Sequence, residues 1–139
     1  MVKNISEFIE KKDYVLDKVL FNGNDYFRFV GNAKLVMEDT LKVKSIGDKD
    51  FVISVGRTIS SEEKNIFNLG VFYDVHFILK DETDKVSESD VELYISDNYE
   101  KFTNVCMAKI ALLIAQITSQ VGKGMPIVSS PYFTREIKD

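Results

Sequence analysis

Hydrophobic and polar residues alternate along the middle of the chain, which is the pattern expected of β-strands. The longest run spans residues 66–79, where one side of the predicted strand is wholly apolar. A second run spans residues 51–60, and the polar segment 60–65 between the two is typical of a hairpin loop. We therefore expect these two strands to pair antiparallel.

The N-terminal part of the chain predicts further strands. Residues 41–44 alternate before a turn signal at residues 46–50, so they should form a third strand paired with the second. Residues 14–21 predict a fourth strand, and residues 26–39 are expected to be extended. Residues 5–11 have the pattern of one or two turns of helix.

The period becomes helical near the C-terminus, where residues 98–121 predict one long helix. Asp97 and Glu100 are a plausible capping pair at its start, and Gly122 suits the position just past its end. The acidic segment 81–90 that precedes it is expected to be a solvated connector, because its spacing matches no calcium loop.

Apolar side chains lie on every side of this helix rather than along one stripe, so it needs cover on two sides. One sheet covers one side, and the second cover is most simply another copy of the protein. We expect no membrane span, because Lys109 interrupts the apolar run and the longest unbroken stretch is residues 110–115. The predicted interface of this homo-oligomer, a dimer or a tetramer, consists of Phe102, Cys106, Ile110, Leu113 and Ile117.

Composition is that of an ordinary globular protein. The 139 residues, 45% hydrophobic and 29% charged, predict a single domain over residues 1–139. A net charge of −4 with scattered basic residues argues against nucleic acid or a membrane surface as a partner. Cys106 has no cysteine to pair with, and the N-terminus lacks the apolar run of a signal peptide, so we expect a cytoplasmic protein.

The sequence offers no set of residues for catalysis. The only histidine, His76, stands in the middle of a predicted strand and is most simply a residue of the sheet's more polar face. The carboxylate pair Glu38 and Asp39 is expected to be solvated surface, and the glycines at 122 and 124 follow a helix instead of starting one. We expect neither a metal nor a cofactor, and we do not expect an enzyme.

The order of these elements resembles the SecB family of protein-export chaperones. Residues 104–133 are similar to the family's long helix and the proline-containing segment after it, here reduced to Met125-Pro126 and Ser130-Pro131. The long strand resembles the family's Phe-x-x-x-Val-x-Tyr-x-Gly-x-Phe pattern, with matches at Phe67, Val71, Tyr73 and Phe77. The resemblance implies an α+β fold, with an antiparallel four-stranded sheet followed by a long C-terminal helix packed on one face.

The resemblance also implies a function, an ATP-independent holdase that binds unfolded or partly folded polypeptides through apolar grooves. In the exporters of this family, acidic residues couple the chaperone to the SecA motor. The corresponding positions here are Lys18, Asn22, Asn68 and Gly70, none of which is acidic, so we expect no coupling to SecA. Apolar residues exposed on the sheet and after the helix are the client-binding candidates, namely Phe72, Ile78, Tyr132 and Phe133. The alternative is a structural or interaction protein of the same fold that self-assembles or binds one folded partner.

Overall fold

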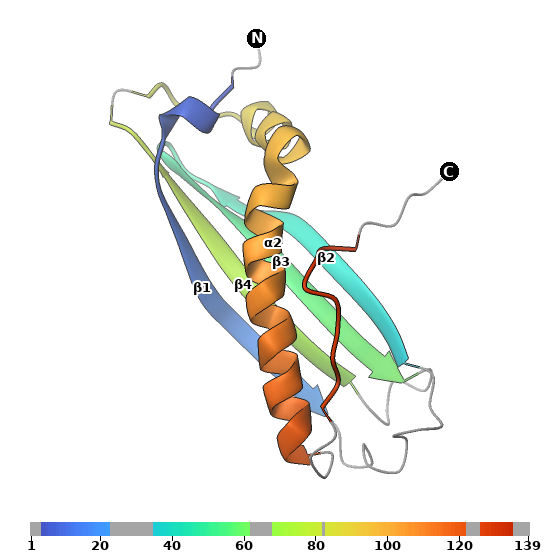
Figure 1. Ribbon diagram of the computed structural model, residues 1–139. Coiled ribbons are helices and arrows are strands. Elements are labelled where there is room, and N and C mark those ends of the chain that lie inside the picture. The colour runs from blue at the N-terminus through green and yellow to red at the C-terminus, as the bar shows by residue number, and fades with distance from the viewer. Residues whose placement is uncertain (1–3, 23–34, 62–67, 82, 122–125, 135–139) are drawn as a thin grey trace.

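The computed structural model describes residues 4–22, 35–61, 68–81, 83–121 and 126–134. A four-stranded antiparallel sheet carries a single long helix diagonally across one face (Figure 1), as the sequence predicts. The elements are η1 (Ser6–Phe8), β1 (Ile9–Asn22), β2 (Leu35–Ile46), β3 (Asp50–Ser61), β4 (Asn68–Leu79) and α2 (Glu88–Val121). Residues 126–134, called the coda below, follow the helix and run back beside it.

The strand order is β1-β4-β3-β2, so β1 and β2 form the two edges of the sheet. The predicted pairs β2–β3 and β3–β4 are confirmed, and both are antiparallel. β1 crosses over to pair with β4, in a register that is interrupted near Asp17. A similar interruption occurs in β2 at Lys44, and such bulges redirect the side chains around them.

Two predicted boundaries are wrong. The expected helix at residues 5–11 is a single 3₁₀ turn, because β1 already begins at Ile9 and pairs with β4. The long helix begins ten residues earlier than expected, at Glu88, so Asp97 and Glu100 lie in its middle. The predicted hairpin loop beyond Ser61 and the helix end at Gly122 lie outside the described residues.

A capping box explains the early start of α2. The backbone N–H of Ser87 donates to Asp90 Oδ2 at 3.0 Å, and the backbone N–H of Asp90 donates to Ser87 Oγ at 3.2 Å. This reciprocal pair satisfies two of the N–H groups that a helix start leaves without partners. The acidic connector predicted over residues 81–90 therefore ends inside a helix.

The first turns of α2 are set at an angle to the rest of the helix (Figure 1). In this region the side-chain amide of Asn98 donates to the carbonyl of Tyr94 at 3.0 Å, and the Thr103 hydroxyl donates to the carbonyl of Tyr99. Side chains that bond to the carbonyl four residues earlier compete with the helix ladder and bend helices. The bend carries the start of α2 over the end of the sheet.

The core lies between α2 and the sheet face beneath it, called the helix face below. Odd-numbered residues of β3 and β4, such as Phe51 and Phe77, supply that face, and their rings stack with centroids 4.6 Å apart. Tyr94 and Phe102 of α2 meet Phe77 edge-on. By length and composition alone α2 could cross a membrane, but core helices share this property, and much of α2 is packed against its own sheet.

The opposite face of the sheet, called the outer face below, is partly covered by long side chains. The Phe72 ring lies over Gly56 and Gly70, since a Cβ added at either glycine would stand within 3 Å of it. The amine of Lys18 lies 4.9 Å from the centre of that ring. The amine of Lys44 reaches across the sheet to Asp74 at 2.7 Å.

Candidate functional site

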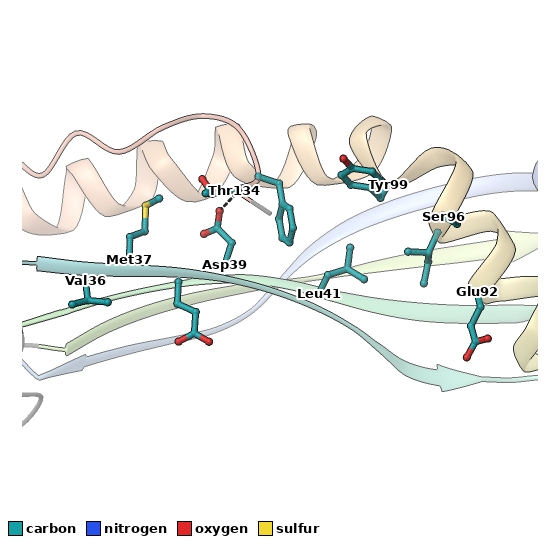
Figure 2. Close-up of a pocket in the computed structure, with 11 residues that line it drawn as sticks. Val36, Met37, Asp39, Leu41, Glu92, Ser96, Tyr99 and Thr134 are labelled. Atoms are coloured by element: carbon teal, nitrogen blue, oxygen red, sulfur yellow. Dashed lines mark hydrogen bonds between the residues drawn. The ribbon is translucent and has the colours of Figure 1, made fainter. Parts of the chain in front are cut away.

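A groove of about 810 Å³ opens along the edge strand β2 (Figure 2). β2 forms one side, the bent first half of α2 forms the other, and the end of the coda closes it. Its lining residues are Val36, Met37, Glu38, Asp39 and Leu41 from β2, Glu92, Ile95, Ser96 and Tyr99 from α2, and Phe133 and Thr134 from the coda. This volume lies within the range typical of ligand-binding clefts.

The groove combines apolar and acidic side chains. Leu41, Ile95 and Phe133 are partly buried against the core and give the groove an apolar floor. Glu92 is an exposed carboxylate at its margin, the carboxylate of Glu38 points to the outer face, and no lysine or arginine is among the lining residues. Such a surface favours apolar groups accompanied by positive charge.

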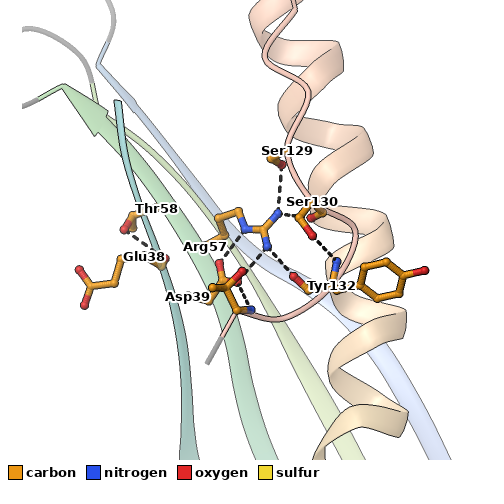
Figure 3. Close-up of polar contacts among 8 residues, drawn as sticks. Glu38, Asp39, Arg57, Thr58, Ser129, Ser130 and Tyr132 are labelled. Carbon is orange, nitrogen blue, oxygen red and sulfur yellow. Dashed lines mark hydrogen bonds and ion pairs between the residues drawn. The ribbon is translucent and has the colours of Figure 1, made fainter. Parts of the chain in front are cut away.

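A buried ion pair organises the end of the groove that the coda closes (Figure 3). Arg57 of β3 and Asp39 of β2 stand opposite each other in the register, and both side chains are 0% exposed. The guanidinium donates from Nε to Asp39 Oδ1 at 2.6 Å and from one terminal nitrogen to Oδ2 at 2.8 Å. This two-point geometry is the strongest form of an arginine–carboxylate contact.

The same pair holds the coda in place. Arg57 donates to the Ser129 hydroxyl at 3.0 Å, to the Tyr132 carbonyl at 2.9 Å and to the Ser130 carbonyl. The backbone N–H of Thr134 donates to Asp39 Oδ2 at 2.8 Å. Every one of these contacts points from the helix face of the sheet toward the coda (Figure 3).

Asp39 corrects the sequence interpretation, which treated it with Glu38 as solvated surface. Only Glu38 is exposed, because alternate residues of a strand face opposite sides and Asp39 faces the helix. Arg57 was not identified at all, although a signal was present. It interrupts the buried positions of β3 between Val55 and Ile59, and a charge at such a position requires a partner.

The four client-binding candidates do not come together. Phe72 and Ile78 lie on the outer face of β4, away from the groove, and the Phe72 ring is engaged with two glycines. Tyr132 and Phe133 lie on the coda. Tyr132 is 64% exposed, and Phe133 alone of the four lines the groove.

The residues predicted to form the oligomer interface face the protein's own sheet. Phe102, Cys106 and Ile110 are 0% exposed, and Leu113 and Ile117 are partly buried against the same core. In this conformation the first three are covered by the protein's own sheet, and their assignment to an interface stays a prediction. The outward side of α2 instead presents Val105 and Leu112, with 38% and 61% of their surfaces exposed.

Two titratable groups of α2, a thiol and a phenol hydroxyl, are held neutral in the core. Burial raises the pKa of the Cys106 thiol to about 12, and burial raises the pKa of the Tyr94 hydroxyl to the same range. His76 is half-buried on the outer face of β4, and Asp74 and Ile78, two residues before and after it, face the same side. Within the described part of the chain, no three acidic, histidine or cysteine side chains are grouped as metal ligands would be.

Comparisons with known proteins identify the fold. No protein-family profile and no curated protein sequence matches this chain. Its structure is similar to that of the SecB-like chaperone Rv1957 of Mycobacterium tuberculosis, solved with a ChAD peptide from the Rv1956 HigA1 antitoxin. The TM-score is 0.67 at 10% sequence identity, over 90% of this chain and 88% of that one. A protein of unknown function from Streptococcus agalactiae aligns at a TM-score of 0.38 with 12% identity over 86% of this chain and 95% of that one. The antiparallel four-stranded sheet followed by one long C-terminal helix is thus a SecB-like α+β fold.

Proposed function

We propose that this protein is an ATP-independent holdase that binds unfolded or partly folded polypeptides in the groove beside β2. The apolar floor of the groove at the free edge of the sheet supports this proposal most directly. Rv1957, which has a similar fold, was solved with a peptide bound, so the fold is compatible with a polypeptide ligand. No nucleotide, metal or other cofactor is part of the proposed activity.

The size of the groove sets the expected affinity. Full burial of one large apolar side chain contributes about 1.5–3 kcal/mol, and a groove of about 810 Å³ admits a few such side chains. After the loss of chain freedom on binding, affinities on the order of micromolar are expected for single segments. Glu92 favours client segments in which lysine or arginine accompanies the apolar residues.

Binding to unfolded chains separates this proposal from a structural protein of the same fold. The experiment follows light scattering of an aggregation-prone protein, and we expect suppression at equimolar amounts. Met37→Glu places a charge in the groove at a position that is 37% exposed and faces the helix, and it should abolish suppression. Ile78→Glu changes a residue of similar exposure, 38%, on the outer face away from the groove, so it is the matched control. No suppression by the unmodified protein would refute the holdase and favour the structural alternative.

We also propose that the protein works as a homo-oligomer in which other copies cover the surfaces it leaves bare. The edge strand β1 exposes apolar residues on both of its faces, and α2 exposes Val105 and Leu112 outward. Exposed apolar surface of this kind usually marks an interface. Light scattering should give a multiple of 15.9 kDa at micromolar protein, and Leu112→Glu should lower it. A mass of 15.9 kDa for the unmodified chain would contradict the oligomer.

Client handling is proposed to be independent of the SecA motor and to take place in the cytoplasm. The positions that correspond to the acidic coupling residues of exporters include Lys18 and Asn68, both exposed on the outer face. A lysine there opposes the acidic character such coupling uses. Binding of purified SecA to the immobilised protein would overturn this part of the proposal.

A further inference from the structure

The Arg57–Asp39 pair binds the coda mainly through its backbone. Arg57 donates to the carbonyls of Ser130 and Tyr132, and Asp39 accepts the N–H of Thr134. The hydroxyl of Ser129 is the one coda side chain that these two residues contact by a hydrogen bond within the described part of the chain. The recognition therefore depends very little on the sequence of the coda.

Any polypeptide carries the same main-chain groups. The coda bends at Pro131 and Tyr132, and with this bend the fork of guanidinium N–H groups reaches the carbonyls of both Ser130 and Tyr132. The carboxylate of Asp39 then accepts an N–H farther along the chain. Such a pair can bind a similarly bent main chain of almost any sequence, which suits a protein whose clients differ in sequence.

The coda itself is held against the protein by little apolar burial. Besides the contacts to the ion pair, the N–H of Ile127 donates to the Thr118 hydroxyl at 2.7 Å. Ile127 and Phe133 are partly buried against the core, whereas Val128 and Tyr132 are largely exposed. A client segment that lay in the same channel and continued into the groove would bury more apolar surface than the coda does.

We propose that the coda is a built-in substitute for a client, and that client polypeptides displace it to place their own main chain on Arg57 and Asp39. Phe133 then leaves its place at the end of the groove, and an apolar client side chain takes it. This inference rests on the proposed function and adds a second, backbone-reading part to the same site. The coda competes with clients, so it lowers their apparent affinity in proportion to the time that it occupies the site.

The first test follows the coda while a client binds. Val128→Cys introduces an exposed thiol for a spin label, and buried Cys106 stays unmodified because burial keeps its thiol protonated. Carboxymethylated lactalbumin, which is permanently unfolded, serves as the client. We expect the label to become mobile as the client saturates the protein. Bound client with an unchanged or less mobile label would overturn the inference and leave the holdase intact.

The second test uses a variant for which a displaced coda and a fixed coda predict opposite changes in client affinity. Phe133→Ala weakens the hold of the coda, so a displaced coda predicts about tenfold tighter binding of the same client. If Phe133 were a fixed wall of the groove, the variant would bind more weakly, and that result, or unchanged affinity, overturns the inference. Tyr132→Ala, an exposed neighbour, should change affinity less than twofold. No client binding by any form would refute the holdase and this inference together.

Discussion

Replacing Asp39 by asparagine should destabilise the protein far more than a surface change on the same strand. The substitution keeps the size of the side chain and removes its charge, so the guanidinium of Arg57 stays buried at 0% exposure without its counter-ion. Breaking a buried ion pair in this way costs about 3–5 kcal/mol of unfolding free energy, because an uncompensated charge remains in the core. The coda also loses the carboxylate oxygen that accepts the Thr134 N–H.

The size of the chain determines how far this loss of unfolding free energy lowers the melting temperature. For 139 residues the unfolding entropy is about 0.3 kcal/mol per kelvin, so the melting temperature should fall by about 10–17 °C. Glu38→Gln is the control, because it removes a carboxylate from the neighbouring, exposed position and should shift the melting temperature by under about 2 °C. The assay is thermal unfolding followed by circular dichroism, with urea unfolding to confirm the free energy.

A small effect of Asp39→Asn would refute this reasoning. A loss below about 1 kcal/mol would mean that water reaches the guanidinium and that the pair is not closed off from solvent. The double variant Asp39→Leu with Arg57→Met checks the same reasoning from the other side. It removes both charges, so it should be more stable than Asp39→Asn while still releasing the coda.

Three further predictions concern the rest of the fold. Gly56→Ala should cost about 1–3 kcal/mol in urea unfolding because its Cβ would stand 2.2 Å from the Phe72 ring, and the added substitution Phe72→Leu should restore part of the loss. A thiol reagent at pH 8 should modify Cys106 only after unfolding, since burial raises its pKa to about 12; rapid labelling of the native protein would contradict this. Tyr94 has a folded pKa of about 12 against an ordinary value of 10, so its share of the stability is complete below pH 10 and is lost as the pH rises toward 12. Tyr94→Phe should flatten that alkaline decline in urea unfolding, and an unchanged decline would exclude Tyr94 as its cause.

Much of the fold follows from local pattern. The period of two along β3 and β4 predicts both strands, their antiparallel pairing and the apolar face that holds Phe51 and Phe77. The start of α2 was missed because the acidic residues near Glu88 resemble a solvated loop, whereas Ser87 and Asp90 cap a helix there. Solvated loops and helix caps contain the same polar residue types, so composition alone does not distinguish a loop from a helix start.

The site was less predictable because its parts are distant in sequence. Asp39 and Arg57 are 18 residues apart and meet only through the register of β2 with β3, and the coda joins them from 72 or more residues farther along the chain. Exposure was also a poor guide, since the aromatic residues Phe72 and Phe133 take different surroundings on opposite faces of the sheet. The signal that could have identified the site was a charged residue at an apolar position of a strand, and that residue is Arg57.

The two edges of the sheet differ, and under the proposed function they take different partners. β1 has apolar residues on both faces and no part of the groove, so a second copy of the same edge can match it along its whole length. β2 has the groove on its helix face and the coda at one end of that groove. If self-association used β2 instead, it would cover the groove and compete with clients. If the protein is an oligomeric holdase as proposed, with self-association through β1, adding client should leave the oligomer's mass per chain unchanged apart from the bound client.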